Sequence, residues 1–228
     1  FKGSLASRGL DDVRKSRSRI RAAIIREKGV NGDREMAYSL HLAGFDVRDV
    51  HMTDLMSGRE TLDDINMLVF CGGFSNSDVL GSAKGWAGGF LWNDTAAATL
   101  RRYYDREDTL SLGVCNGCQL MIELNLLFGI GGERPVEMAH NRSHKFESQF
   151  VNMTIPENNS VMFGPLSGVR AGIWVAHGEG RFVFRKAMSE FNIVGRYSYK
   201  DYPANPNGST GAVAALASAD GRHLAMMP

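Results

Sequence analysis

The sequence predicts an α/β fold built on an open, mostly parallel sheet, and two features of its pattern carry that prediction. In the first half, short apolar runs alternate with helical patterns across brief connections, which is typical of a doubly wound sheet. After Phe128 the apolar runs become shorter and are separated by turns, which favours mixed or antiparallel pairing. We therefore expect a flavodoxin-like sheet with helices on both faces and a mixed or antiparallel extension in the C-terminal half.

The spacing of apolar residues locates the elements of the first half. Short apolar runs predict strands at residues 20–25, 45–50, 67–71 and 110–114. The run 67–71 has no alternation, as expected for a strand that is covered on both faces. The turn and capping residues 29–35 open a helix through Met36 and Leu40 that stops at Gly44. Residues 95–104 also read as helix, whereas the glycine-rich stretch from Gly81 to Gly89 is expected to be a shaped loop.

The second half predicts strands and turns. Strands are expected at residues 150–155, 173–176, 181–184, 193–199 and 212–216. His223 follows the turn Asp220-Gly221-Arg222 and is expected to be exposed. The loop 202–209 is dense in turn formers, and it is either a structural corner or a loop that faces a partner or the mouth of an active site.

Composition narrows the class of protein. The 228 residues, 43% hydrophobic with a net charge of +1, are enough for one sizeable α/β domain. The net charge of +1 gives no overall attraction to a nucleic acid or a membrane surface, and no apolar stretch approaches the ~20 residues of a membrane span, so neither is expected as partner. The chain starts at Phe1, so we expect a piece of a longer protein, with the basic residues 1–19 a linker from an upstream domain and residues 20–228 the domain itself. Three cysteines favour a reducing, cytoplasmic setting.

Cys115 is the residue that points most directly to chemistry. The apolar run that ends at Val114 leads into Gly-x-Cys-x-Gly, and a helical pattern through Leu120 and Leu124 follows at once. This arrangement predicts a strand, a sharp turn and a helix with a thiol at the turn, the cysteine form of a nucleophile elbow. The N–H groups at the start of the helix are expected to lower the thiol pKa and to stabilise an oxyanion, which favours covalent acyl transfer.

A double glycine after a neighbouring strand supports this interpretation. Residues 71–75 read Cys-Gly-Gly-Phe-Ser, and ligands on parallel sheets collect at the carboxyl ends of strands. The backbone N–H at Gly73 is thus a candidate second arm of an oxyanion hole.

The same residues allow other interpretations. Cys115 and Cys118 also form a Cys-x-x-Cys pair, but the Asn-Gly between them favours a tight turn and Cys118 is expected to pack, so a dithiol redox site is a minor alternative. Zinc is weaker still, because no second Cys/His pair has ligand spacing, and we expect no metal site. None of the six histidines is a convincing base, and His177-Gly178-Glu179-Gly180 at a strand end is either a backbone-lined ligand site or a simple turn.

Six motifs occur in an order that closely resembles the glutaminase domains of phosphoribosylformylglycinamidine synthases, the purine-pathway amidotransferases. The motifs are residues 29–36, 71–75, 113–119, 141–143, 176–180 and 202–209. The resemblance runs from about Ile20 to Pro228, and the run Cys-Asn-Gly-Cys-Gln is more similar to the large single-chain form than to the small separate subunit.

The resemblance implies a triad (class I) glutamine amidotransferase. Cys115 would attack the side-chain amide of L-glutamine to release ammonia, and the γ-glutamyl thioester would then be hydrolysed. Gly73 and Asn116 would form the oxyanion hole, and Gln119 with His177, Gly178 and Glu179 would hold the glutamine. Ammonia would pass to a synthetase domain of the same polypeptide, which converts formylglycinamide ribonucleotide to formylglycinamidine ribonucleotide. ATP and Mg²⁺ are expected in that portion and no cofactor in this domain, which has no P-loop.

The sequence departs from the family at its end. In the family the triad histidine and glutamate follow a stretch like Leu224–Pro228 as His-Pro-Glu, and this sequence stops at Pro228. The catalytic base and its orienting carboxylate are therefore expected outside this chain, and loss of a triad base costs on the order of 10⁴ in rate, so the fragment alone is expected to be inactive. Two alternatives stay open: another cysteine-elbow hydrolase of the same fold, and a catalytically silent docking domain.

Overall fold

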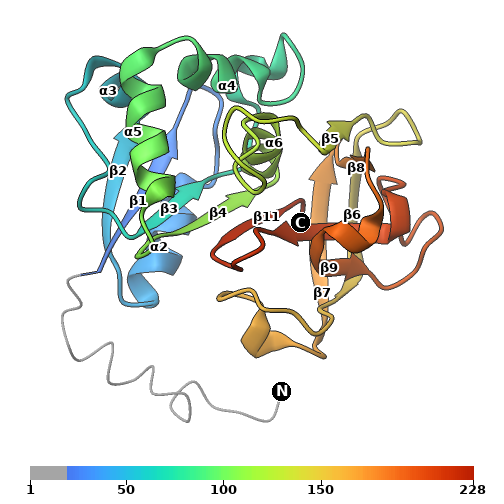
Figure 1. The fold of residues 1–228 in the computed structure, drawn as a ribbon. Coiled ribbons are helices and arrows are strands. Elements are labelled where there is room, and N and C mark those ends of the chain that lie inside the picture. Colours follow the sequence, from blue (N-terminus) through green and yellow to red (C-terminus); the bar gives the residue numbers. More distant parts are fainter. Residues whose placement is uncertain (1–19) are drawn as a thin grey trace.

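The computed structural model describes residues 20–228, which form a long mixed sheet with helices packed around one half of it (Figure 1). Within these residues the sheet has nine strands in the order β2-β1-β3-β4-β11-β10-β9-β6-β7, and β5 pairs with β8 in a separate two-stranded sheet. The predicted linker at residues 1–19 lies outside the described residues. No helix between residues 20 and 228 is both long and apolar enough to cross a bilayer.

The elements follow the predicted order along the chain. The strands are β1 Arg21–Arg26, β2 Asp46–His51, β3 Met67–Phe70, β4 Leu110–Val114, β5 Val136–Ala139, β6 Glu147–Thr154, β7 Arg170–His177, β8 Arg181–Phe184, β9 Asn192–Tyr197, β10 Val213–Ala217 and β11 His223–Met226. The α-helices are α2 Asp33–Leu42, α3 Met52–Ser57, α4 Lys84–Leu91, α5 Asp94–Asp105 and α6 Asn116–Glu123. Short 3₁₀ turns are η2 Ser75–Asp78, η3 Gly164–Leu166, η4 Met188–Glu190 and η5 Thr210–Ala212.

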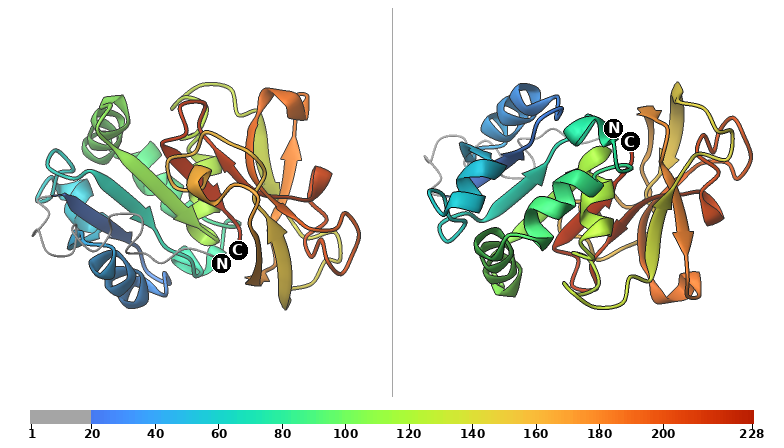
Figure 2. Two further views of the ribbon diagram at one scale, coloured as in Figure 1. Left: turned by 90° about the horizontal axis from the view of Figure 1, so that it is seen from below. Right: turned by 90° about the horizontal axis from the view of Figure 1, so that it is seen from above.

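Strands β2, β1, β3, β4 and β11 run parallel to one another and form the doubly wound half. The central residues of β1 are apolar on both sides: Ala22 and Ile24 face a cluster that includes Leu40 of α2, whereas Ala23 and Ile25 face the larger cluster on the opposite side. The larger cluster takes in side chains of α3, α4, α5 and α6, and Figure 2 shows α2 on one face of the sheet with the other helices on the opposite face. The predicted fold class, helices on both faces included, is confirmed.

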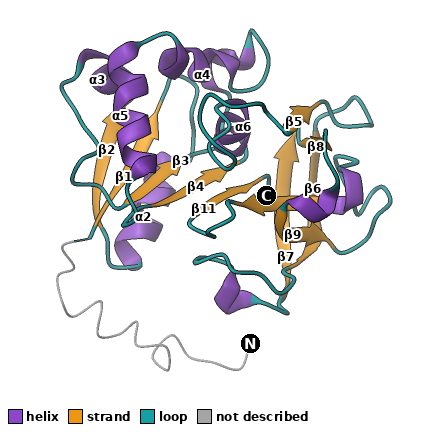
Figure 3. Ribbon diagram, in the orientation of Figure 1, coloured by secondary structure: helices purple, strands orange, loops and turns teal. Residues whose placement is uncertain are grey.

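Beyond β11 every strand pairing in the sheet is antiparallel, which confirms the predicted extension. The helical segments between the strands of this half, β6, β7, β9 and β10, are short 3₁₀ turns, and none is an α-helix. One face of these strands buries a smaller cluster that includes Val151, Val175 and Tyr197. Figure 3 shows the α-helices gathered around the parallel half and strands and loops dominating the other. In the described part of the chain, one continuous sheet therefore consists of a parallel half covered by α-helices and an antiparallel half without them.

Three elements were missed and one loop prediction was wrong. The stretch from Gly81 to Gly89 is not a loop, because residues 84–91 form α4, whose Trp86 and Phe90 are fully buried against Phe70 of β3. Tertiary burial of these aromatic rings outweighs the low helix propensity of the glycines. The missed elements are α3, β5 and β11, and β5 and β11 have only four residues each.

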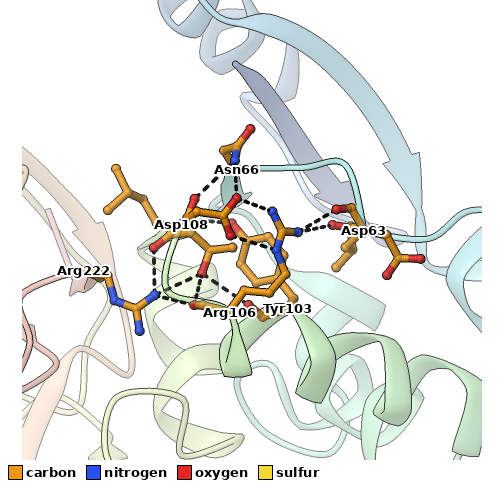
Figure 4. A network of polar contacts seen from close by, with 9 residues as sticks. Asp63, Asn66, Tyr103, Arg106, Asp108 and Arg222 are labelled. Carbon is orange, nitrogen blue, oxygen red and sulfur yellow. Dashed lines mark hydrogen bonds and ion pairs between the residues drawn. The ribbon is translucent and has the colours of Figure 1, made fainter. Parts of the chain in front are cut away.

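Arg106 and Arg222 tie the start of β4 to its neighbours (Figure 4). The Arg106 guanidinium donates to the backbone carbonyls of Leu62 and Asp63 and pairs with the Asp108 carboxylate at 2.8 Å. Asn66 donates to the same carboxylate at 3.0 Å, and Arg222 donates to the backbone carbonyl of Arg106 at 2.6 Å. This network joins the segments that precede β3, β4 and β11.

His223 is buried, so the prediction of an exposed histidine is wrong. It is the first residue of β11, only 4% exposed, and its Nδ1 lies 2.9 Å from the Ser111 hydroxyl of the adjacent β4. The Tyr104 ring packs on the imidazole with centroids 4.5 Å apart. Burial lowers the pKa of His223 to about 4, with Arg222 adding to the effect.

The burial of His223 predicts a loss of stability in acid. Between its ordinary pKa of 6.5 and the folded-state value of about 4, the unfolded chain binds a proton that the folded chain does not, so stability falls as pH falls through this window. Replacing His223→Gln should remove roughly 3 kcal/mol of that pH dependence. Chemical denaturation at a series of pH values from 7 down to 4 measures it.

The exposed His41 of α2 provides a matched control as His41→Gln. Because the readout is the slope of stability against pH, a uniform destabilisation of the His223→Gln variant does not obscure the result. An unchanged slope in that variant would contradict the buried, neutral histidine.

Candidate functional site

Cys115 lies at a sharp turn between β4 and α6, as the sequence predicted. Its backbone has φ 53° and ψ −108°, a strained conformation for a residue with a side chain. The turn is possible because α6 lies directly against β3 and β4: a Cβ at Gly113 would lie 2.5 Å from the Gly117 carbonyl oxygen, and one at Gly117 would collide with the Phe70 carbonyl. The two glycines of the motif thus allow the close approach that holds the thiol at the carboxyl end of β4.

The thiol is enclosed by backbone. The Cys115 Sγ donates to the Ala176 carbonyl of β7 at 3.8 Å, and a Cβ on Gly72 would lie 3.3 Å from the Cys115 Cβ. The backbone N–H groups of Gly73 and Asn116 both lower the pKa of the thiol, as expected for donors that face it. Burial outweighs them, so the pKa of Cys115 is raised, and the prediction of a lowered pKa is wrong. A thiolate at this position needs a base to form.

The turn at Gly73 is held by a separate segment of the chain. Val30 and Gly73 form an antiparallel bridge, in which Asn31 N–H donates to the Gly72 carbonyl and Phe74 N–H donates to the Gly29 carbonyl, both at 2.9 Å. Gly73 has φ +118°, and a Cβ there would lie 2.6 Å from the Gly29 oxygen, so only glycine fits. This bridge positions the Gly73 N–H against Cys115.

A chain of amide side chains fixes the first turn of α6. The Asn116 Oδ1 accepts from Ser75 N–H at 3.0 Å, and its Nδ2 donates to the Gln119 Oε1 at 3.0 Å. The Gln119 Nε2 in turn donates to the Glu179 backbone carbonyl at 2.9 Å. The chain runs from the Gly73 turn through α6 to the 177–180 loop, so three predicted site residues form one connected unit.

Asp78 joins this unit, although sequence reasoning assigned it no role. Its Oδ1 accepts from Asn116 Nδ2 at 3.3 Å and from Ala83 N–H at 3.2 Å, and burial raises the pKa of the carboxyl, with Glu179 adding to the effect. Asn76, Ser77 and Asp78 all have left-handed φ values between 49° and 58°. Asn and Asp adopt this region more readily than most residues, but single residues do so as a rule, and the sequence does not signal three in a row.

Two buried asparagines hold the 177–180 loop. Asn141 donates to the His177 carbonyl at 2.6 Å and accepts from Gly180 N–H at 3.0 Å, and its own N–H donates to the Gly178 carbonyl at 2.8 Å. Asn207 donates to the Gly180 carbonyl at 2.6 Å. Both residues lie in motifs that the sequence singled out, but their role as loop supports follows only from the structure.

His177 contributes its backbone rather than its ring to this loop. The ring is buried, both of its nitrogens lack hydrogen-bond partners within the described residues, and burial lowers its pKa to about 4. The side chain of Glu179, by contrast, reaches Ser82 N–H at 3.4 Å and lies 3.9 Å from the His140 ring. Among residues 20–228 no histidine nitrogen bonds the Cys115 Sγ.

The dithiol alternative finds no support in the geometry. Cys115 and Cys118 are both free thiols, and Cys118 is fully buried in the core on the inner face of α6. Burial raises the pKa of Cys118 well above its ordinary value, which makes it a poor resolving thiol.

The elbow, the glycine turn and the 177–180 loop meet at the carboxyl end of β4. Residues 19–228 match the family described as the CobB/CobQ-like glutamine amidotransferase domain. The chain belongs to this family of glutamine amidotransferase domains.

Two relatives similar in sequence to this chain are phosphoribosylformylglycinamidine synthases. The chain is 42% identical to phosphoribosylformylglycinamidine synthase of Drosophila melanogaster over 95% of its length, and 43% identical to the Homo sapiens protein of that name over 91%. It spans only 17% of the length of either relative. The solved structure described as PurLQS from Thermotoga maritima is 28% identical with a TM-score of 0.73, covering 92% of this chain and 86% of that chain.

The close approach of α6 to the sheet predicts a severe effect of one added methyl group. Gly117→Ala should destabilise the domain by about 3 kcal/mol or more, because the collision is with backbone that has no freedom to move. Gly88→Ala in α4 is the matched control, since its Cβ meets only the Trp92 ring at 3.5 Å and should stabilise the helix by about 0.5–1 kcal/mol. Thermal melts of the two variants measure this difference in stability, and equal melting temperatures would contradict the predicted collision at Gly117.

The buried thiol predicts slow alkylation of Cys115 at neutral pH. Because the thiolate reacts and the pKa is raised, the pH at which iodoacetamide labels Cys115 at half its maximal rate should lie above that of a cysteine in a short unstructured peptide. Peptide mapping by mass spectrometry follows the labelling. A midpoint below that of the peptide would show that the N–H groups of Gly73 and Asn116 dominate over burial.

Proposed function

We propose that this amidotransferase domain hydrolyses L-glutamine through a covalent γ-glutamyl thioester on Cys115. The single observation that carries the proposal is the strained Cys115 at the carboxyl end of β4 with two backbone N–H groups facing its thiol. Nucleophile elbows of this kind present a reactive side chain where a carbonyl carbon and an oxyanion site can be reached together.

The chemistry follows in two steps. The Cys115 thiolate attacks the side-chain amide carbon, and the oxyanion that forms accepts hydrogen bonds from the N–H groups of Gly73 and Asn116. The C–N bond then breaks, and the nitrogen takes up a proton to leave as ammonia. Water attacks the resulting thioester carbon, which releases glutamate and returns the thiol.

The proposed glutamine-binding residues are those that the hydrogen bonds connect. Gln119, His177, Gly178 and Glu179 supply the wall opposite the elbow, through side-chain amide, carboxylate and backbone groups. The Ala176 carbonyl beside Cys115 belongs to the same strand end, so the substrate amide would lie between β4 and β7. Glu179 is the proposed partner for a positively charged substrate group.

The raised pKa of Cys115 makes a general base necessary, and we propose that it comes from outside residues 20–228. The resemblance places the triad histidine and glutamate in a His-Pro-Glu sequence after a stretch like Leu224–Pro228. In support, Cys115 N–H donates to the Met226 carbonyl at 2.9 Å, so the end of β11 lies directly beside the nucleophile (Figure 1).

The role in a larger enzyme is also a proposal. The relatives that share 42–43% identity are phosphoribosylformylglycinamidine synthases several times longer than this chain. We propose that ammonia passes to a synthetase portion of the same polypeptide, which would hold ATP and Mg²⁺ and amidate formylglycinamide ribonucleotide in the cytoplasm.

A diazo-ketone analogue of glutamine tests the nucleophile. The analogue should alkylate Cys115 stoichiometrically in the intact protein, and glutamine should protect against it. Cys115→Ser should lose both labelling and glutaminase activity, whereas Cys71→Ser, at a buried cysteine at the end of β3, is the matched control and should keep both. Labelling of Cys71 or Cys118 would contradict the assignment.

An ammonia-release assay tests the source of the base. A protein extended by some tens of residues beyond Pro228 should turn over glutamine at least on the order of 10⁴ times faster than the 228-residue chain. Adding the synthetase portion should raise the rate further. Equal and robust turnover by the two chains would show that the base lies within residues 1–228.

A further inference from the structure

A cavity on the antiparallel half is not used by the proposed reaction. It has a volume of about 550 Å³ and lies between the 202–211 loop and residues 142–143. This size is in the range of sites for small organic ligands. The loop that forms most of its wall is the one whose function the sequence left open.

The charged groups of the wall favour an anion. Arg142 and Lys200 line the cavity with one acidic residue, Asp201. Within the described residues, neither cation forms an ion pair or a side-chain hydrogen bond. The stem of Arg142 packs on Gly208, where a Cβ would lie 2.8 Å from the Arg142 Cβ, and the exposed guanidinium lies at the wall of the cavity. An arginine whose guanidinium has no ion pair or hydrogen bond is suited to bidentate contact with a phosphate.

The side-chain amide of Asn205 adds a polar group to the wall. Asn205 is 4% exposed, and its Nδ2 donates to the carbonyls of Lys200 and Ser209, both at 3.0 Å. These two bonds fix the amide orientation, and the Oδ1 is left buried without a partner. An acceptor without a partner is costly, and a small movement of the wall would let an N–H or O–H of a bound molecule reach the Oδ1.

The cavity wall also contains an aromatic ring. Tyr202 lines the same cavity and is 66% exposed, so its face is free to stack on a planar ring. An anion beside Arg142, a stacking surface and a buried acceptor for an amino or hydroxyl group together describe a mononucleotide better than a simple anion.

We propose that this cavity is a binding site for a purine mononucleotide, with its phosphate on Arg142 and Lys200 and its base on Tyr202. The site is separate from Cys115 but shares its supports: Arg142 N–H donates to the Asn207 carbonyl, and Asn207 also holds Gly180 of the candidate active site. The inference concerns binding alone and stands whether or not the domain hydrolyses glutamine.

Photolabelling of the intact protein with 8-azido-AMP locates the site even if other nucleotide sites exist elsewhere in the polypeptide. Label should map by mass spectrometry to the peptide that contains Tyr202. AMP should compete for this label, whereas adenosine and inorganic phosphate, which each lack one half of the ligand, should compete at least about tenfold more weakly.

Substitutions at Arg142 test whether this residue binds the nucleotide that labels the peptide. Arg142→Gln should reduce the affinity for AMP at this peptide about tenfold, and Arg142→Lys, which keeps the charge and stem, should restore part of it. Lys186→Gln, an exposed lysine outside the cavity, is the charge-matched control and should not change labelling. The proposal is overturned if residues 200–211 are not labelled, if inorganic phosphate competes as well as AMP, or if Arg142→Gln labels like the wild type.

Discussion

The close approach of α6 to the sheet is the constraint on which the site depends. Without side chains at Gly113 and Gly117, the helix starts directly on β4 and forces Cys115 into a positive φ. The same approach aims the first N–H of the helix at the thiol and sets Asn116 and Gln119 toward the surrounding loops. Backbone packing, rather than any charged group, therefore decides where the nucleophile lies.

The two halves of the sheet contribute different parts of the site. The parallel half supplies the thiol and the Gly73 turn, and the antiparallel half brings the end of β7 and the 177–180 loop against them. Neutral amides hold the interface: Asn116, Asn141 and Asn207 all donate to or accept from loop groups at 2.6–3.3 Å. An amide satisfies a buried donor and acceptor at once and does not require a buried charge to be paired.

Local pattern was enough to predict four of the five parallel strands and the turn that holds Cys115. Each of these depends on a few neighbouring residues, such as the glycines beside Cys115. The features that the local pattern could not predict depend on contacts between residues far apart in the sequence. His223 is buried only because β11 inserts beside β4, and α4 exists because Trp86 packs on β3. The raised pKa of Cys115 likewise follows from enclosure by segments distant in sequence.

Trapping the covalent intermediate tests the central claim most directly. Rapid acid quench of the protein, joined to its catalytic base and synthetase portion and turning over L-glutamine, should leave a fraction with a mass increase of one glutamyl group. Fragmentation should place that group on the Cys115 sulfur. A glutamyl adduct on another residue, or sustained turnover with the Cys115→Ser variant, would contradict the account.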